Sequence, residues 1–260
     1  MISKQTGVIL LCVLTLTAVP VAVTAADFDV TTDDTIDVVD RTVEQGGSTF
    51  QITEVTQVDP SDQITVSVDA PADADFRMDV YNENGTPVGR AYEGTGSKEF
   101  NIDISGQGVS KAGNYAFIIQ FDGVNEAAHP LVVRGYSVSA DPPSSVTTGD
   151  TLSVDGSFNQ LRGEEYNRVD VVVASTSSDE QKVKKASVDG DTFSASVSTD
   201  DLDTGSYDVY AVVRGSDIVF GGQEEILGLS SPQLLEIEGE ESDSETTSSG
   251  GGSGGGGGGG

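Results

Sequence analysis

The chain has 260 residues and a formal net charge of −30, because 43 aspartates and glutamates stand against only 13 lysines and arginines. A charge of this sign repels phosphate backbones and anionic bilayer surfaces, which argues against nucleic acid as a partner. One histidine, His129, and one cysteine, Cys12, leave little material for Ser-His-Asp or Cys-His catalysis and none for a histidine-rich zinc site.

Residues 1–26 have the layout of a secretory signal peptide. Lys4 is the only charged side chain among them, residues 7–23 are mostly apolar, and small residues end the stretch at Ala26. We expect a signal helix that is cleaved there, which leaves a mature chain without cysteine. The alternative is an uncleaved membrane anchor over residues 7–23, although this stretch is short for a span and contains Pro20.

Residues 28–133 show short strand patterns separated by turns. Residues 63–69 alternate apolar and polar side chains, which indicates a strand with one buried face. Residues 76–81 and 88–92 flank an Asn84-Gly85 turn. Because Asn-Gly adopts positive φ at low cost, these two segments are predicted to form a hairpin.

Two more strands are predicted to end this first unit. Phe100, Ile102 and Ile104 line one face of a strand. Residues 126–133 close the unit, and Pro130 predicts an edge position for this last strand, since proline cannot donate a hydrogen bond to a sheet ladder.

Tyr115 and Tyr207 occur in the same local pattern. Each lies two residues after a glycine, Gly113 or Gly205, and each opens an apolar run. This spacing is typical of a tyrosine corner, in which the hydroxyl bonds to the backbone a few residues upstream. We expect both tyrosines to be structural residues that tie the sheets of a β-sandwich together.

The pattern after residue 134 repeats the pattern before it. Residues 149–152 resemble residues 47–50, and residues 168–171 resemble residues 77–80. Together with the two tyrosine patterns, these similarities predict an all-β chain of two tandem immunoglobulin-like β-sandwiches. The predicted units are residues 27–134 and residues 135–238.

Residues 239–260 change character, from acidic residues to threonine and serine and then to a glycine run. Such a composition cannot build a hydrophobic core. We expect this segment to be a disordered tail.

Two local sequences are candidate sites. Asp200, Asp201 and Asp203 gather carboxylates in the turn before Tyr207, which could bind calcium or could be an ordinary aspartate-rich turn. Asn84 opens the single N-glycosylation sequon, in the predicted hairpin turn. No other cofactor is expected.

The acidic residues are scattered along both predicted units. A field this strong opposes a compact fold unless salt screens it, and at molar ionic strength the Debye length falls to about 3 Å. We interpret the charge as an adaptation of the whole surface to concentrated salt. A dedicated cation site is the alternative.

These features together resemble a family of haloarchaeal secreted and cell-surface glycoproteins with immunoglobulin-like domains, the S-layer-associated type. The resemblance covers the whole chain. It is carried by the secretory leader, the acidic composition, the Phe-x-Ala-x-Val strand at residues 193–197, the Thr/Ser/Gly-rich tail, and the Leu-x-x-Gly-x-Tyr corner of Leu202, Gly205 and Tyr207.

The resemblance implies a secreted or cell-surface structural or adhesive interaction module of a halophilic archaeal envelope, with other envelope proteins or glycans as partners. Membrane attachment would come only from an uncleaved leader or from an anchor beyond Gly260. A carbohydrate-binding or glycan-processing accessory protein is the alternative, with Tyr81 and Tyr92 as candidate aromatic platform. We expect no enzymatic activity, because nothing in the sequence marks a cleft with tuned carboxylates.

If the charge is an adaptation to concentrated salt, stability should depend strongly on ionic strength. We expect the free energy of unfolding in urea to rise as sodium chloride increases from about 0.1 M to about 1 M, because repulsion between the acids is then screened. Urea is uncharged, so it leaves the ionic strength unchanged during the titration. Equal stability at both salt concentrations would contradict this interpretation.

Overall fold

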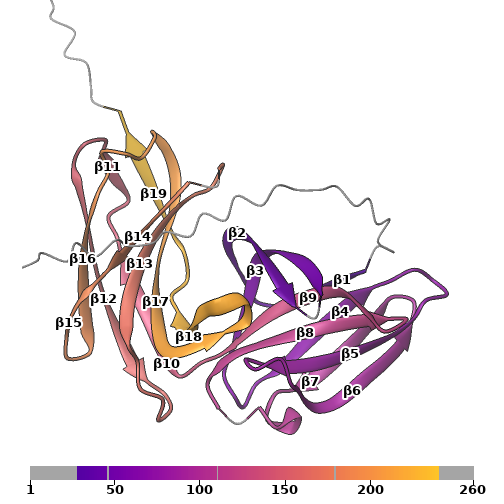
Figure 1. The fold of residues 1–260 in the computed structure, drawn as a ribbon. Helices are drawn as coiled ribbons and strands as arrows, with labels where there is room; N and C mark the ends of the chain where they lie inside the picture. The colour runs from indigo at the N-terminus through magenta and orange to yellow at the C-terminus, as the bar shows by residue number, and fades with distance from the viewer. Residues whose placement is uncertain (1–27, 46, 110, 179, 240–260) are drawn as a thin grey trace, which may run out of the picture.

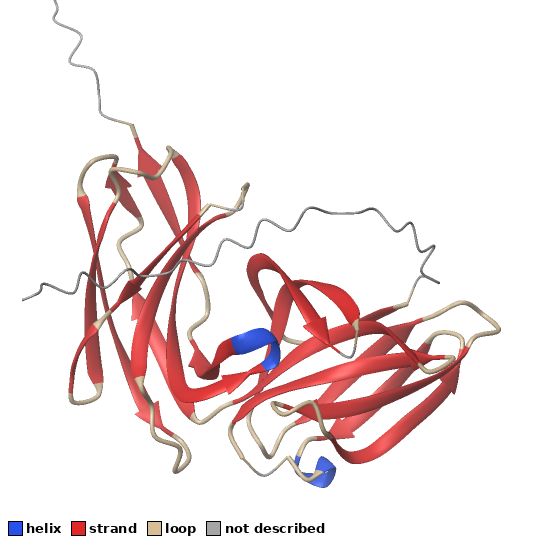
Figure 2. Cartoon of the chain, in the orientation of Figure 1, coloured by secondary structure: helices blue, strands red, loops and turns tan. Residues whose placement is uncertain are grey.

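The computed structural model describes residues 28–45, 47–109, 111–178 and 180–239, whose regular elements are strands and two short 3-10 turns (Figure 2). The all-β prediction is therefore confirmed. The predicted signal peptide and the tail from residue 240 onward lie outside the described residues. Within the described part of the chain, no helix has the length and hydrophobicity that a membrane span requires.

The segment up to residue 134, which we call the N-terminal half, consists of two sheets packed face to face (Figure 1). The smaller sheet has the strand order β1-β4-β7, and the larger has the order β2-β3-β9-β8-β5-β6. The strands are β1 (Asp29–Thr32), β2 (Thr35–Gln45), β3 (Ser48–Val58), β4 (Gln63–Asp69), β5 (Asp75–Asn82), β6 (Pro87–Thr95), β7 (Lys98–Asp103), β8 (Gly113–Phe121) and β9 (Val124–Val133), with the 3-10 turn η1 (Ser105–Gln107) after β7.

The core of this half lies between its two sheets, because side chains point alternately to the two faces of a strand. In β4, Ile64, Val66 and Val68 are buried and alternate with more exposed residues. They share one continuous hydrophobic cluster with Met78 and Phe117 of the larger sheet. β4 coincides with the strand that the alternation predicts, and the β5–β6 hairpin is also where the Asn-Gly turn predicts it.

The segment from residue 135, which we call the C-terminal half, has the same layered construction. Its smaller sheet has the order β10-β12-β16-β15 and its larger sheet the order β11-β19-β17-β13-β14, with β18 paired to the second part of β17. The strands are β10 (Tyr136–Asp141), β11 (Ser145–Thr147), β12 (Thr151–Gln160), β13 (Arg168–Ser175), β14 (Gln181–Lys185), β15 (Ser187–Asp189), β16 (Thr192–Ser198), β17 (Gly205–Val219), β18 (Gln223–Leu229) and β19 (Gln233–Glu238), with the 3-10 turn η2 (Phe220–Gly222) between β17 and β18.

The strand orders are those of an immunoglobulin sandwich. The smaller sheet of the C-terminal half has the order A-B-E-D, and the larger contains G-F-C with a further strand, β14, at the C edge. The N-terminal half repeats this arrangement without strand D. Its β3 runs parallel to β9 as β11 runs parallel to β19, and β2 is an added strand that forms a hairpin with β3. That the two halves are separate domains stays a prediction.

Pro130 does not mark an edge strand, so that prediction is wrong. β9 lies inside the larger sheet, between β3 and β8. Its parallel pairing with β3 begins at Leu131, one residue after the proline. Proline has no N–H to donate to a neighbouring strand, and Pro130 lies just outside the stretch of β9 that pairs with β3. A proline can therefore be accommodated here although the strand is internal.

The predicted correspondence between residues 47–50 and residues 149–152 is also wrong. The second segment leads into β12 of a smaller sheet, whereas the first leads into β3 of a larger sheet. Gly47 and Gly149 both have positive φ, at 87° and 89°. The two sequences are alike because each needs a glycine in a left-handed turn before a strand, a local requirement that does not identify the strand's place in a sheet.

Tyr115 and Tyr207 both point their hydroxyls at the turn that precedes their strands. The Tyr115 hydroxyl donates to the backbone carbonyl of Lys111 at 3.2 Å. The Tyr207 hydroxyl lies 2.9 Å from the carbonyl of Asp203 and 2.7 Å from Oε2 of Glu180, so its single hydrogen is shared between two acceptors. Both rings are buried, and burial raises the pKa of Tyr115 to about 12.

Removal of these two hydroxyls should destabilise the fold to different degrees. We expect Tyr115→Phe to lower the free energy of unfolding by about 1 kcal/mol, the net value of a neutral hydrogen bond. Tyr207→Phe should lower it by about 2 kcal/mol, because this hydroxyl also faces a charged carboxylate. Urea denaturation at constant salt measures both.

The control is Tyr166→Phe, since the Tyr166 ring is 37% exposed and forms no part of either turn. Its effect should stay within about 0.5 kcal/mol. Equal losses for all three variants would contradict a specific structural role of the Tyr115 and Tyr207 hydroxyls.

Candidate interaction site at the junction of the two halves

The two halves meet through the outer faces of their larger sheets, and their long axes form a steep angle (Figure 1). Seven buried apolar side chains form a cluster of their own at this contact, separate from the cores of the two sandwiches. Removal of this surface from water holds the halves together. The cluster consists of Val55 and Val132 from the N-terminal half and of Val172, Ala174, Tyr210, Val212 and Leu229 from the C-terminal half.

Hydrogen bonds to the backbone of β18 align the two halves. The side-chain amide of Gln57 donates to the carbonyl of Leu229 at 3.1 Å and accepts from its N–H at 2.7 Å, as a neighbouring strand would. The side-chain oxygen of Asn114 accepts from the N–H of Ile226 at 2.7 Å. At the elbow between the halves, the N–H of Gly135 donates to the carbonyl of Leu227 at 2.8 Å. The joint is thus held at several points and not by a free linker.

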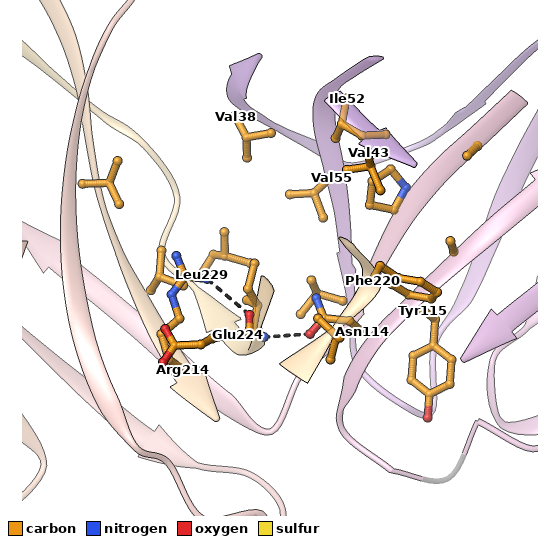
Figure 3. Close-up of a pocket in the computed structure, with 18 of the residues that line it drawn as sticks. Val38, Val43, Ile52, Val55, Asn114, Tyr115, Arg214, Phe220, Glu224 and Leu229 are labelled. Atoms are coloured by element: carbon orange, nitrogen blue, oxygen red, sulfur yellow. Dashed lines mark hydrogen bonds between the residues drawn. The ribbon is translucent and has the colours of Figure 1, made fainter. Parts of the chain in front are cut away.

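A pocket of about 150 Å³, here called the junction pocket, remains where the apolar contact ends (Figure 3). A cavity of this volume admits a group about the size of benzene. Apolar side chains line most of it, and they come from both halves. Examples are Val38, Val43, Phe50 and Ile52 of the β2–β3 hairpin and Val172 and Val183 of β13 and β14.

Two hairpins form walls of the junction pocket. Phe50 and Ile52 in β3 are both buried, on one side of the strand, and both line the pocket. The β17–β18 hairpin contributes Val219 and Phe220 at its tip, and the η2 turn there packs against β2. Figure 3 shows Val43, Ile52 and Phe220 on the same side of the pocket.

A charged network lies at the rim of the junction pocket. The carboxylate of Asp170, only 3% exposed, accepts from Nε of Arg168 at 2.9 Å and from Nε of Arg214 at 3.2 Å. The guanidinium of Arg168 also pairs with Glu224, and this pairing lowers the pKa of the Glu224 carboxyl. Arg214 and Glu224 line the pocket, so the network connects β13, β17 and β18 beside it.

The N-terminal half contains the same pair of residue types. Nε of Arg77 lies 2.6 Å from Oδ2 of Asp79, a carboxylate that is also buried. Asp79 in β5 and Asp170 in β13 each follow a core residue, and both point to the outer face of the larger sheet of their half. The predicted similarity of residues 77–80 and 168–171 has this physical basis, because a buried carboxylate needs a charged partner.

Glu225 lies on the other face of β18 from Glu224, between two glycines. A β-carbon on Gly113 would come within 2.7 Å of one of its carboxylate oxygens, and a β-carbon on Gly215 within 2.0 Å of the other. Burial raises the pKa of Glu225 to about 7, an effect that Asp217, Glu83 and Glu164 reinforce and that Lys111 opposes. The junction therefore holds a carboxyl group that keeps its proton near neutral pH.

His129 is buried in β9, away from the lining of the junction pocket. Its Nε2 lies 2.6 Å from the hydroxyl of Thr56, and its Nδ1 lies 3.6 Å from a carboxylate oxygen of Glu54. Burial lowers the pKa of the imidazole. This environment is that of a packed strand residue with satisfied hydrogen bonds.

The three aspartates of the predicted calcium site have separate partners. Oδ2 of Asp200 accepts from the hydroxyl of Ser198 at 2.6 Å, and Asp201 pairs with Lys182 at 3.3 Å. Asp203 uses its backbone carbonyl as the acceptor for a tyrosine corner. Among the described residues, no group of three or more His, Cys, Asp or Glu side chains is arranged to hold a metal ion. The calcium site stays a prediction.

The remaining predicted site residues lie in the first hairpin and its surroundings. Asn84 is exposed in the β5–β6 turn, where its Nδ2 donates to Glu83, so glycosylation at this position stays a prediction. Tyr81 is half-buried and its hydroxyl accepts from the side chain of Gln120. Tyr92 is only 6% exposed, so it offers no open ring face for a sugar to stack on.

The junction pocket was not predicted, although one signal for it is present in the sequence. Residues 169–174 are Val-Asp-Val-Val-Val-Ala, without the alternation of a strand that has one wet face, and all six are buried in β13. A strand that is apolar on both sides must be covered on both faces of its sheet. The sequence does not show which segment provides the second cover.

No protein-family model matches the chain, and no curated protein matches it. Among solved structures, it is similar to native E. coli alpha-2-macroglobulin, with 10% identity and a TM-score of 0.27 over 78% of this chain and 16% of that one. It is also similar to the human OSCAR ligand-binding domain, with 15% identity and a TM-score of 0.25 over 70% of this chain and 93% of that one.

A third structure is a tandem repeat from the extending region of a large adhesion protein, with 15% identity and a TM-score of 0.26 over 82% of this chain and 49% of that one. The chain thus spans less than a fifth of the alpha-2-macroglobulin and about half of the adhesion fragment. TM-scores this low do not indicate a shared overall arrangement, so these similarities do not bear on function.

The raised pKa of Glu225 predicts a stability profile that a single substitution should change. The folded chain holds this proton up to about pH 7, whereas the unfolded chain releases it near pH 4.5. The unfolded state therefore binds fewer protons between these values, and stability is lost as pH rises through this window. Glu225→Gln should be more stable than the wild type above pH 7, and the advantage should vanish below pH 4.5.

The matched control is Glu165→Gln, which removes the same charge from an exposed position. Thermal unfolding of the three proteins across this pH range, at constant salt, measures the difference. If both variants shift the profile equally, the effect comes from the net charge and not from the position of Glu225 between the two glycines.

Proposed function

We propose that the chain is an exported interaction module that holds an extended segment of another envelope protein at the junction pocket, without bond chemistry. The observation that supports this most directly is the junction pocket itself, which is lined mostly by apolar side chains and is open to solvent beside Val183, a residue that is 53% accessible. An apolar pocket with a few polar groups at its rim is typical of a binding site.

The rigid joint supports the same proposal. Gln57 and Asn114 fix β18 against the N-terminal half, so the walls of the pocket are in place before a partner arrives. A preformed site loses less conformational entropy on binding than a flexible one. A module of this kind suits a structural or adhesive role, in which one surface must meet its partner in a defined orientation.

The sequence supports the compartment. The leader over residues 1–26 argues for export, and the net charge of −30 suits a solvent of high salt. We infer a secreted or cell-surface protein of a halophilic archaeal envelope. Its partners are then other components of the same envelope.

A photo-crosslinking amino acid tests the site of interaction. Val183 in β14 and Val188 in β15 are a matched pair, since both are exposed valines on edge strands, but only Val183 lines the junction pocket. We expect illumination of producing cells to give a discrete adduct from position 183 and none from position 188. No adduct at position 183, or equal adducts at both positions, would contradict the proposal.

A further inference from the structure

β14 leaves one edge of its sheet without a partner strand. Its residues pair only with β13, and no described strand lies on its other side. An edge of this kind presents backbone N–H and C=O groups that can pair with a further strand. Natural proteins protect such edges against unwanted strand pairing. The side chains of β14 therefore indicate which kinds of strand could pair with its open edge.

The hydrogen-bond pattern identifies which backbone groups are free. The N–H of Ser175 donates to the carbonyl of Glu180, and the N–H of Ala186 donates to the carbonyl of Val169. Both pairs continue the antiparallel register of β13 and β14. Hydrogen-bonded and non-hydrogen-bonded pairs alternate along antiparallel strands. The residues whose backbone groups point away from β13 are therefore Gln181, Val183 and Lys185.

β14 is a basic strand in an acidic chain. Three of its five residues are lysines and none is acidic. Lys182 pairs with Asp201 and donates to the carbonyl of Ser198. Lys184 and Lys185 are exposed, and in the part of the chain that the structure describes neither forms an ion pair.

The two faces of β14 differ in chemistry. Gln181, Val183 and Lys185 share one face of the strand, and Gln181 and Val183 of this face line the junction pocket, where Val183 continues its apolar surface. Lys182 and Lys184 alternate with them and therefore lie on the opposite face. A strand added beside β14 would place every second side chain next to apolar surface and the others next to lysines.

We propose that β14 binds an extended segment in which acidic and apolar residues alternate, as an added strand of the larger sheet. The inference rests on the proposed function and names the chemistry of its partner. Backbone hydrogen bonds to Val183 would supply affinity, and the two faces of the strand would supply specificity. Partner acids would meet the lysine face, and partner apolar residues would cover Val183 and reach toward the junction pocket.

Salt separates the two contributions. The attraction between lysines and partner acids is screened at molar ionic strength, whereas backbone pairing and apolar burial are not weakened in this way. Salt also screens the repulsion between partner acids and the net charge of −30, so the lysine contribution is read from a comparison: the affinity difference between the wild type and a variant without Lys184 should be largest at low salt and vanish at molar salt.

A blocked hexapeptide of alternating glutamate and valine, carrying a fluorescent label, is the probe. Fluorescence anisotropy with the full chain should show saturable binding. The same peptide with every second backbone amide N-methylated should bind about tenfold or more weakly, because it cannot pair as a strand. A peptide of alternating lysine and valine should not bind.

Variants of β14 complete the test. Val183→Pro removes an N–H that points away from β13, so the sheet should persist while strand addition is blocked. Val183→Thr keeps the backbone and the branched shape and tests the apolar face if the proline variant fails to fold. Lys184→Gln removes the lysine of the opposite face that forms no ion pair among the described residues, so it should weaken binding at low salt and match the wild type at molar salt.

Absence of peptide binding, or binding that N-methylation leaves unchanged, would overturn the inference. Equal binding of the glutamate and lysine peptides would do the same, and would mean that the lysines only prevent unwanted pairing of the edge. A crosslinked adduct from position 183 without peptide binding would contradict the proposed acidic and apolar partner segment but would still support an interaction site at the junction pocket.

Discussion

The two halves hold together because part of the outer face of each larger sheet is buried against the other half. Val132, Val172 and Tyr210 point away from the cores of their own halves and toward the other half. Apolar surface stabilises a fold by about 25 cal/mol for each Å² removed from water, so the force that packs each sandwich also closes the junction. Gln57 then sets the alignment, because its amide can make both hydrogen bonds to Leu229 only in one position. The junction pocket and the edge of β14 have fixed places as a consequence.

The burial of surface at the cores and at the junction also determines how the buried carboxylates are compensated. Asp79 and Asp170 are buried, and each lies beside an arginine that compensates it. Glu225 has no arginine and instead stays protonated near neutral pH because of its burial. Of the 13 lysines and arginines in the chain, Arg77, Arg168 and Arg214 serve the two buried aspartates. Lys184 and Lys185 of β14 are exposed and form no ion pair among the described residues, which sets this strand apart from the acidic surface around it.

Much of the strand content could be predicted, because it follows from local chemistry. The alternation in residues 63–69 corresponds to β4, and the Asn-Gly turn lies in the β5–β6 hairpin. The predictions that were wrong used a local sequence pattern to infer the position of a strand within its sheet. Pro130 by itself predicts an edge strand, and only the pairing of β3 with β9 shows that the strand is internal. The similarity of Gly47 and Gly149 likewise reflects a turn and not an equivalent strand.

Local patterns and composition are enough to predict that the chain is built of strands, where many of these strands begin and end, and that the chain carries a large negative charge. These properties depend on neighbours in the chain and on composition. The packing of the strands in space shows in addition which apolar strands cover each other, where the junction pocket lies and which sheet edge remains open. An apolar run such as Val171 to Ala174 indicates that both faces of its strand are buried, but it does not indicate which segments cover them. The residues of the N-terminal half that cover this strand at the junction, Val55 and Val132, are about 40 residues or more away in the chain.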